Sequence, residues 1–129
     1  MSDRVVLDTS ALIRFFTLDD QKKAQKVKAL LESTREVVLI ESVLLELVFT
    51  LLKVYKLQKS DVVEIVQFLA SRPNIAVTPE LQDGMELYLN NNLSITDCLV
   101  IAHAEGSSIA SFDTELLKHP WAHSVWEKE

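Results

Sequence analysis

The sequence has 129 residues, of which 48% are hydrophobic and 25% are charged, and its formal net charge is −6. This length suits one domain over residues 1–129, which can fold without disulfide bonds. The two glycines, Gly84 and Gly106, are too far apart for the glycine-rich phosphate-binding loops of nucleotide enzymes, which need closely spaced glycines. A single cysteine, no apolar stretch long enough to span a bilayer and no signal-peptide pattern lead us to expect a cytoplasmic protein without membrane association.

The N-terminal segment predicts a strand followed by two helices. Residues 4–7 form a short apolar run that predicts a buried strand ending at Asp8. Thr9 and Ser10 suit the start of a first helix. The acids at 19–20 suit the positive end of a second helix.

The middle of the chain predicts two further strands. Residues 37–40 are continuously apolar, which is typical of a strand buried on both faces. A long helix over about 42–56 follows, and Ser60 with Asp61 opens another helix. Residues 75–77 give the third strand.

The C-terminal part continues the alternation. Pro79 suits the first turn of a helix, and Ser94 or Thr96 begins the next one. Residues 108–111 predict a fourth strand, and residues 124–126 predict a final edge strand. Alternation of this kind favours an α/β fold with a parallel sheet and helices on both faces.

Four carboxylates occupy positions that such a fold would bring to one edge of the sheet. Asp8 follows the first strand, and Asp113 follows the fourth. Glu46 lies early in the helix after the second strand, and Asp97 begins the helix before the fourth. Functional sites of open α/β sheets lie at the carboxyl ends of the strands. Carboxylates gathered there repel one another and need a divalent cation, so we expect metal-dependent hydrolysis of a phosphodiester.

Three of these acids also have a structural explanation. Asp8 and Asp113 could each cap the helix that follows, and Asp97 could complete a capping box with Ser94. Any of the three carboxylates could therefore serve the fold alone.

Glu46 presents a different case, because its neighbours are almost all apolar. This predicts a buried carboxylate, which costs on the order of several kcal/mol unless it is neutralised. The structural alternative to a metal is an ion pair with Lys53 or a hydrogen bond from Thr50.

Basic side chains gather in one short segment despite the net negative charge. Lys22, Lys23, Lys26 and Lys28 lie within seven residues that contain no acid. A cluster of this kind is either a solvated helix face or a site for phosphate groups. We expect phosphate contacts from Arg14, Lys22, Lys23 and Lys26.

Taken together, four short motifs resemble those of the PIN-domain ribonucleases, particularly the small toxins of VapBC-type toxin–antitoxin modules. The motifs are VVLDTSALIRFF, SVLLELV, ITDCLVIAHA and IASFDTEL, in that order along nearly the whole chain. The resemblance implies a PIN-like three-layer sandwich, in which a five-stranded parallel sheet lies between helices. It also implies an endoribonuclease that uses Mg²⁺ or Mn²⁺ and cuts single-stranded or looped RNA.

The resemblance further implies roles for individual residues. Asp8 would be the first metal ligand, Glu46 and Asp97 would complete the inner acidic set, and Asp113 would be the fourth acid. The supporting residues would be Thr9, Ser10 and Ser111. A small antitoxin protein would bind and block this acidic site, and the protein would form a homodimer.

Two other functions fit parts of the same pattern. The first is a PIN fold that binds RNA or serves as a scaffold without catalysis. The second is a receiver-type phosphoacceptor domain, which has a similar length and alternation. A receiver domain needs an aspartate at the end of its third strand and a lysine on its last, whereas Thr78 follows the third strand here and residues 124–126 contain no lysine.

Overall fold

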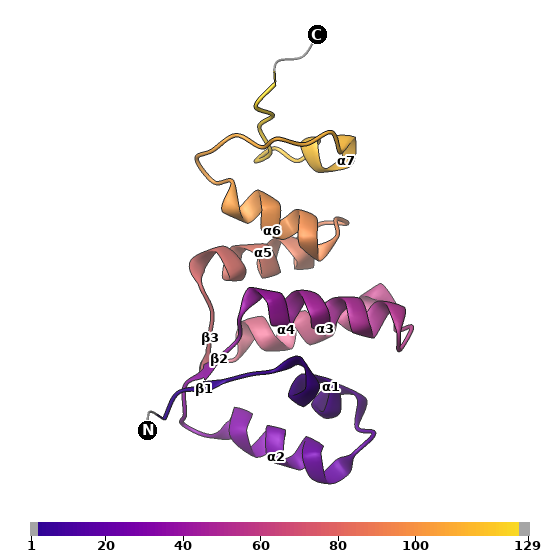
Figure 1. Cartoon of the computed structure of the whole chain (residues 1–129), viewed down its shortest axis with the longest axis vertical. Helices are drawn as coiled ribbons and strands as arrows, with labels where there is room; N and C mark the ends of the chain where they lie inside the picture. The colour runs from indigo at the N-terminus through magenta and orange to yellow at the C-terminus, as the bar shows by residue number, and fades with distance from the viewer. Residues whose placement is uncertain (1–2, 127–129) are drawn as a thin grey trace. The chain divides into compact units, whose positions relative to one another are not determined.

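Three short parallel strands organise the N-terminal part of the chain (Figure 1). The computed structural model describes residues 3–126. The strands β1 (Val5–Val6), β2 (Val37–Val38) and β3 (Ile75–Ala76) are adjacent in that order, with β2 in the middle. Val37 lies opposite Val5 on one side and Ile75 on the other. The predicted α/β class and parallel pairing are confirmed.

Seven helices accompany the strands in the described residues: α1 (Thr9–Thr17), α2 (Gln21–Glu32), α3 (Glu41–Lys53), α4 (Lys59–Ser71), α5 (Pro79–Asn90), α6 (Ile95–His103) and α7 (Thr114–Leu117). The chain divides into two compact units, one ending at Thr78 and the other beginning at Pro79. The N-terminal unit holds the sheet and α1 to α4, and the C-terminal unit holds α5 to α7. The expectation of one domain over residues 1–129 stays a prediction.

The prediction of a five-stranded sheet is wrong, because the sheet has three strands within residues 3–126. The two remaining predicted strands, 108–111 and 124–126, make one isolated parallel bridge between Ile109 and Ser124. Main-chain bonds from Ile109 N to His123 O at 2.6 Å and from Val125 N to Ile109 O at 2.9 Å hold it together. The segment Ser108–Ser111 has one large apolar side chain, so a longer ladder there would bury little apolar surface.

The run at residues 37–40 is also less buried than predicted. Val37 and Leu39 are buried, whereas Val38 is half-buried and Ile40 is exposed. The run therefore alternates in the way of a strand with one covered face.

Helix packing builds the core of the N-terminal unit. The helix α1 packs against both α2 and α3, and α3 packs against α4 (Figure 1). In α2 the buried side chains are Ala24, Val27 and Leu31, a spacing that places one stripe of the helix against its neighbours. The helix α3 ends at Lys53, earlier than predicted, and Lys56 follows with a positive φ of 56°.

A close helix–helix contact organises the C-terminal unit, where α5 packs on α6. A Cβ atom on Gly84 of α5 would overlap the Leu99 side chain of α6, so glycine permits this approach. Ser94 caps α6 by accepting from Asp97 N at 3.1 Å. None of the helices in the described part of the chain is long and apolar enough to cross a membrane.

Candidate functional site

Asp8 follows β1 and caps α1, as one of its two explanations predicted. Ser10 donates to Asp8 Oδ2 twice, from its Oγ at 2.7 Å and from its main-chain N at 3.3 Å. These bonds, the side-chain one first, hold the pKa of the exposed Asp8 carboxyl below its ordinary value. The carboxylate is thus ionised at neutral pH, and Oδ1 takes no part in the two bonds. Capping a helix and binding a cation are compatible at this position.

The two supporting residues predicted beside Asp8 differ in their surroundings. Ser10 is exposed and bonded to Asp8, whereas Thr9 is buried with 7% of its surface exposed. Ser10 therefore has the contact expected of a supporting residue, and Thr9 lies in the core at the start of α1.

The expectation that Glu46 is buried is wrong. Val43, Leu44, Leu47, Val48 and Leu51 form the buried face of α3, and Glu46 is exposed outside that stripe, as is Phe49. An apolar composition does not fix which positions of a helix face the core, and here the helix turns Glu46 outward. Its carboxylate is solvated, so burial does not force it to be neutralised.

The structural alternative for Glu46 also finds no support. Within the described residues no ion pair joins Glu46 to Lys53, and no hydrogen bond joins it to Thr50. The side chain is thus an exposed carboxylate on the surface of α3.

Asp97 lies in the first turn of α6 and is half-buried. The cap of this helix uses the main-chain N of Asp97, which donates to Ser94 Oγ. The cap therefore does not consume the Asp97 carboxylate.

Asp113 caps α7, as its structural explanation predicted. Its Oδ1 accepts from Glu115 N at 3.0 Å and from Leu116 N at 3.2 Å. Ser111 Oγ accepts from Asp113 N at 3.0 Å, so the predicted neighbour of this acid does contact it. Both cap bonds end on one oxygen, which leaves Oδ2 of this exposed carboxylate outside the cap.

The four acids are shared equally between the two units. Asp8 and Glu46 belong to the N-terminal unit, and Asp97 and Asp113 belong to the C-terminal unit. Among residues 3–126, no three His, Cys, Asp or Glu side chains form a group that could hold a metal ion. The expected meeting of all four acids stays a prediction.

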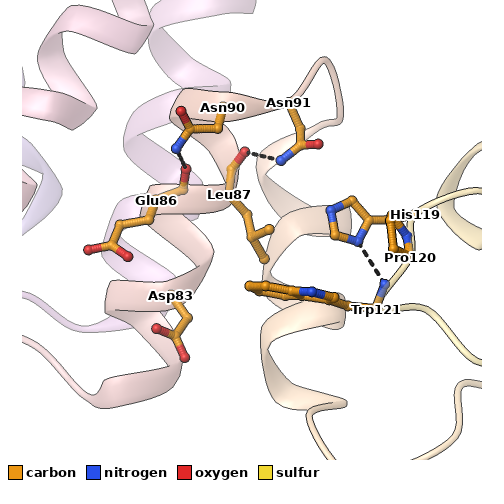
Figure 2. A pocket seen from close by; sticks show the side chains of 8 residues that line it. All are labelled: Asp83, Glu86, Leu87, Asn90, Asn91, His119, Pro120 and Trp121. Atoms are coloured by element: carbon orange, nitrogen blue, oxygen red, sulfur yellow. Dashed lines mark hydrogen bonds between the residues drawn. The ribbon is translucent and has the colours of Figure 1, made fainter.

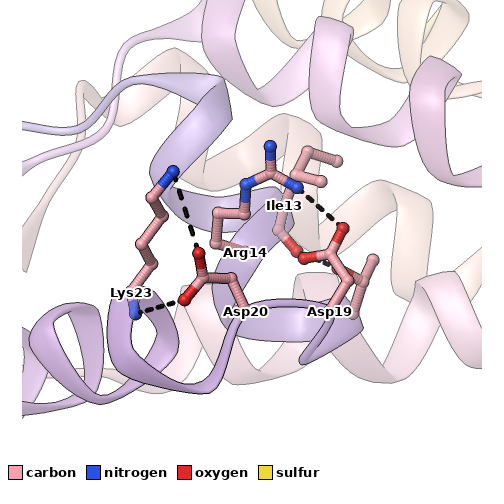
Figure 3. Close-up of polar contacts among 6 residues, drawn as sticks. Ile13, Arg14, Asp19, Asp20 and Lys23 are labelled. Atoms are coloured by element: carbon pink, nitrogen blue, oxygen red, sulfur yellow. Dashed lines mark hydrogen bonds and ion pairs between the residues drawn. The ribbon is translucent and has the colours of Figure 1, made fainter.

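The basic side chains near the start of α2 are exposed, and two of the expected phosphate contacts are engaged with acids (Figure 3). Arg14 Nη1 lies 2.7 Å from Asp19 Oδ2, and Lys23 Nζ lies 3.8 Å from Asp20 Oδ2. The same Asp20 caps α2 by accepting from Lys23 N at 3.1 Å. A phosphate group would compete with these carboxylates for Arg14 and Lys23.

Lys22 and Lys26 differ from their neighbours. Both are exposed on α2, and neither forms an ion pair with another described residue. Of the four expected phosphate contacts, these two have their full charge available.

A cavity of about 350 Å³ lies in the C-terminal unit, at a place that the sequence did not indicate (Figure 2). The side chains that line it come from α5, from the residue just after it and from the loop after α7: Asp83, Glu86, Leu87, Asn90, Asn91, His119, Pro120 and Trp121. Segments far apart in the sequence form this cavity. The local sequence feature that could have drawn attention to it is the run His119-Pro120-Trp121.

Comparison with known proteins gives one family. The model of the PIN domain family matches residues 5–121. A VapC ribonuclease from Aquifex aeolicus (strain VF5) is 26% identical over 109 residues, which cover 81% of each chain. No solved structure matches significantly.

Proposed function

The chain belongs to the PIN domain family, and we propose that it is a metal-dependent endoribonuclease, which hydrolyses phosphodiester bonds in RNA. The observation that carries the proposal is the extent of the family match. Residues 5–121 include every acid of the expected site, namely Asp8, Glu46, Asp97 and Asp113. The similarity to a VapC ribonuclease supports RNA as the substrate.

The chemistry of these side chains fits Mg²⁺ or Mn²⁺. Both ions prefer hard oxygen ligands, and all four residues offer carboxylate oxygens. Asp8 is exposed and accepts a hydrogen bond from Ser10 that lowers its pKa, and Glu46 is exposed. Asp8, Glu46 and Asp97 would hold the ion, with Asp113 as a fourth acid. When bound, the ion would supply Lewis acidity toward the phosphate and the attacking water.

Other side chains of this protein would orient the acids and the substrate. Ser10 fixes the Asp8 carboxylate, and Ser111 fixes the main chain at Asp113. Lys22 and Lys26 would contact phosphates of single-stranded or looped RNA, because neither charge is neutralised by a neighbouring acid among the described residues. Arg14 and Lys23 would join them after exchanging their carboxylate partners for phosphate.

We further propose that the protein is the toxin of a toxin–antitoxin module. Its partners would be RNA, a small antitoxin that covers the acidic site, and a second copy of the chain. Because the proposed substrate is RNA, we expect the protein to act in the cytoplasm.

One observation favours a second function, a PIN fold that binds RNA without cleaving it. Asp8 and Asp113 both serve as helix caps, so both would be retained for stability even without catalysis. Turnover of labelled single-stranded and looped RNA with Mn²⁺ separates the two proposals. Metal-dependent products that disappear in Asp8→Asn support the nuclease, whereas saturable RNA binding without turnover supports the scaffold.

A further inference from the structure

Negative charge is concentrated in the C-terminal unit. Residues 79–126 contain a single lysine or arginine, Lys118, and seven acids: Glu80, Asp83, Glu86, Asp97, Glu105, Asp113 and Glu115. Lys118 Nζ lies 2.9 Å from Glu115 Oε1, so its charge is already paired. By contrast, residues 3–78 contain ten acids and eleven lysines and arginines. The C-terminal unit therefore attracts cations, whereas the N-terminal unit is nearly neutral.

Trp121 lines two cavities of this unit. Its indole lines the 350 Å³ cavity described above and also a second cavity of about 490 Å³. The side chain is 59% exposed, and Asp83 likewise lines both cavities. An exposed indole face beside a carboxylate is a combination that cations occupy in proteins.

His119 contacts both the main chain and the indole of Trp121. His119 Nδ1 accepts from Trp121 N at 3.1 Å, and the two rings meet edge to face with centroids 5.6 Å apart. The Leu87 side chain extends from α5 toward the indole (Figure 2). The bond fixes the main chain at Trp121 and the ring contact restricts its indole, which lowers the entropic cost of binding.

Carboxylates and carboxamide groups lie around the smaller cavity. Asp83 and Glu86 contribute carboxylates. Asn90 Nδ2 donates to Glu86 O at 2.8 Å, and Asn91 Nδ2 donates to Leu87 O at 3.0 Å (Figure 2). These bonds leave the carboxamide oxygen and one amide N–H of each asparagine unused. No lysine or arginine lines either cavity in the part of the chain that the structure describes.

We propose that the Trp121 pocket binds the arginine side chain of a basic protein segment. A guanidinium is planar, carries five N–H donors and no acceptor, and stacks on aromatic faces, which matches the indole and the carboxylates of Asp83 and Glu86. A lysine ammonium matches the charge but not the flat face. RNA is disfavoured, because its phosphates would approach Asp83, Glu86 and Glu105. The inference does not depend on ribonuclease activity.

The test uses Trp121 as its own reporter. The chain has two tryptophans, so Trp126→Phe leaves Trp121 as the only indole and retains an aromatic ring for the stack with Phe112. The probes are the peptide acetyl-Gly-Arg-Gly-amide and its citrulline counterpart, which is neutral but nearly isosteric. Titrations are made at constant ionic strength and followed by Trp121 fluorescence.

The expected result is a saturable change with the arginine peptide and at least about tenfold weaker binding of the citrulline peptide, since citrulline loses both the carboxylate and indole attractions. Asp83→Asn and Glu86→Gln should each weaken arginine binding roughly two- to fivefold. Glu115→Gln is the matched control, because it removes one charge of the same unit outside both cavities. Its affinity should equal that of the Trp126→Phe parent.

Three results would overturn the proposal. Equal binding of the two peptides would show that charge is not recognised. An equal loss in Glu115→Gln and Glu86→Gln would show attraction to the whole unit and no pocket. Tighter binding of an oligoribonucleotide than of the arginine peptide, reported by Trp121, would assign the pocket to nucleobases.

Discussion

Ser10 holds the Asp8 carboxylate through two hydrogen bonds to the same oxygen, at 2.7 Å from Oγ and 3.3 Å from the main-chain N. One short contact thus serves two purposes. It caps the N-terminus of α1. It also lowers the pKa of an exposed acid at a position where the family's site is expected.

Ser10→Ala should raise the pKa of Asp8 toward its ordinary value, because the stronger of the two bonds is lost. A lowered pKa in the folded state stabilises the fold above the unfolded value of about 3.9 and loses that effect as pH falls through the folded value. The free energy of unfolding of the variant should therefore be lower than that of the wild type above pH of about 4. It should also fall less steeply as the pH is lowered. Carboxyl-carbon NMR titration of Asp8 measures this directly. An unchanged titration curve would contradict the role given to Ser10.

Asp113 allows its structural and functional roles to be separated. Asp113→Ala should lower the free energy of unfolding by about 0.5–2 kcal/mol, because both cap bonds to α7 are lost. Asp113→Asn should keep most of that stability, since asparagine caps helices equally well, while removing the charge. Urea unfolding and RNA cleavage are measured on both variants. If Asp113→Asn were destabilised as much as the alanine variant, the cap would depend on charge and the separation would fail.

Glu46→Gln should change the free energy of unfolding by less than about 0.5 kcal/mol, because the side chain is exposed. If Glu46 is a metal ligand, cleavage should fall by roughly a hundredfold or more. Lys53→Gln is a matched control on the exposed surface of the same helix, and it should alter neither property. A large loss of stability in Glu46→Gln would restore a structural role for this acid.

The buried Tyr88 side chain should make the free energy of unfolding depend on pH in the alkaline range. Burial, and secondarily the charge of Cys98, raises the pKa of Tyr88 above its ordinary value of 10.0. Its contribution is fully present below about pH 10 and is lost as the pH rises through the folded value. Tyr88→Phe should therefore flatten the alkaline decline. Urea unfolding near pH 8 and pH 10.5 compares the two proteins, and an equal decline in both would rule Tyr88 out as its cause.

Local signals in the sequence predicted the helices well. Asp8, Asp20, Ser94 and Asp113 all cap helices in the structure, because the bond from an N-terminal amide to a nearby side chain is encoded within a few residues.

Features that depend on tertiary packing could not be predicted from the local sequence. Glu46 was expected to be buried because its neighbours are apolar, but the rotation of α3 against the core decides its exposure. The last two strands reduce to one bridge at Ile109, since pairing depends on partners that local sequence does not specify. The Trp121 pocket was missed because α5 and the loop after α7 meet only in the folded chain.

The most direct measurement compares cleavage of a labelled single-stranded RNA by the wild-type protein and by Asp97→Asn. Both are purified identically and assayed with Mn²⁺ and with EDTA. The account predicts products only with the wild type and Mn²⁺, while circular dichroism shows the same helix content in both proteins. Equal cleavage by the two proteins, or cleavage that persists in EDTA, would contradict the proposed metal-dependent nuclease.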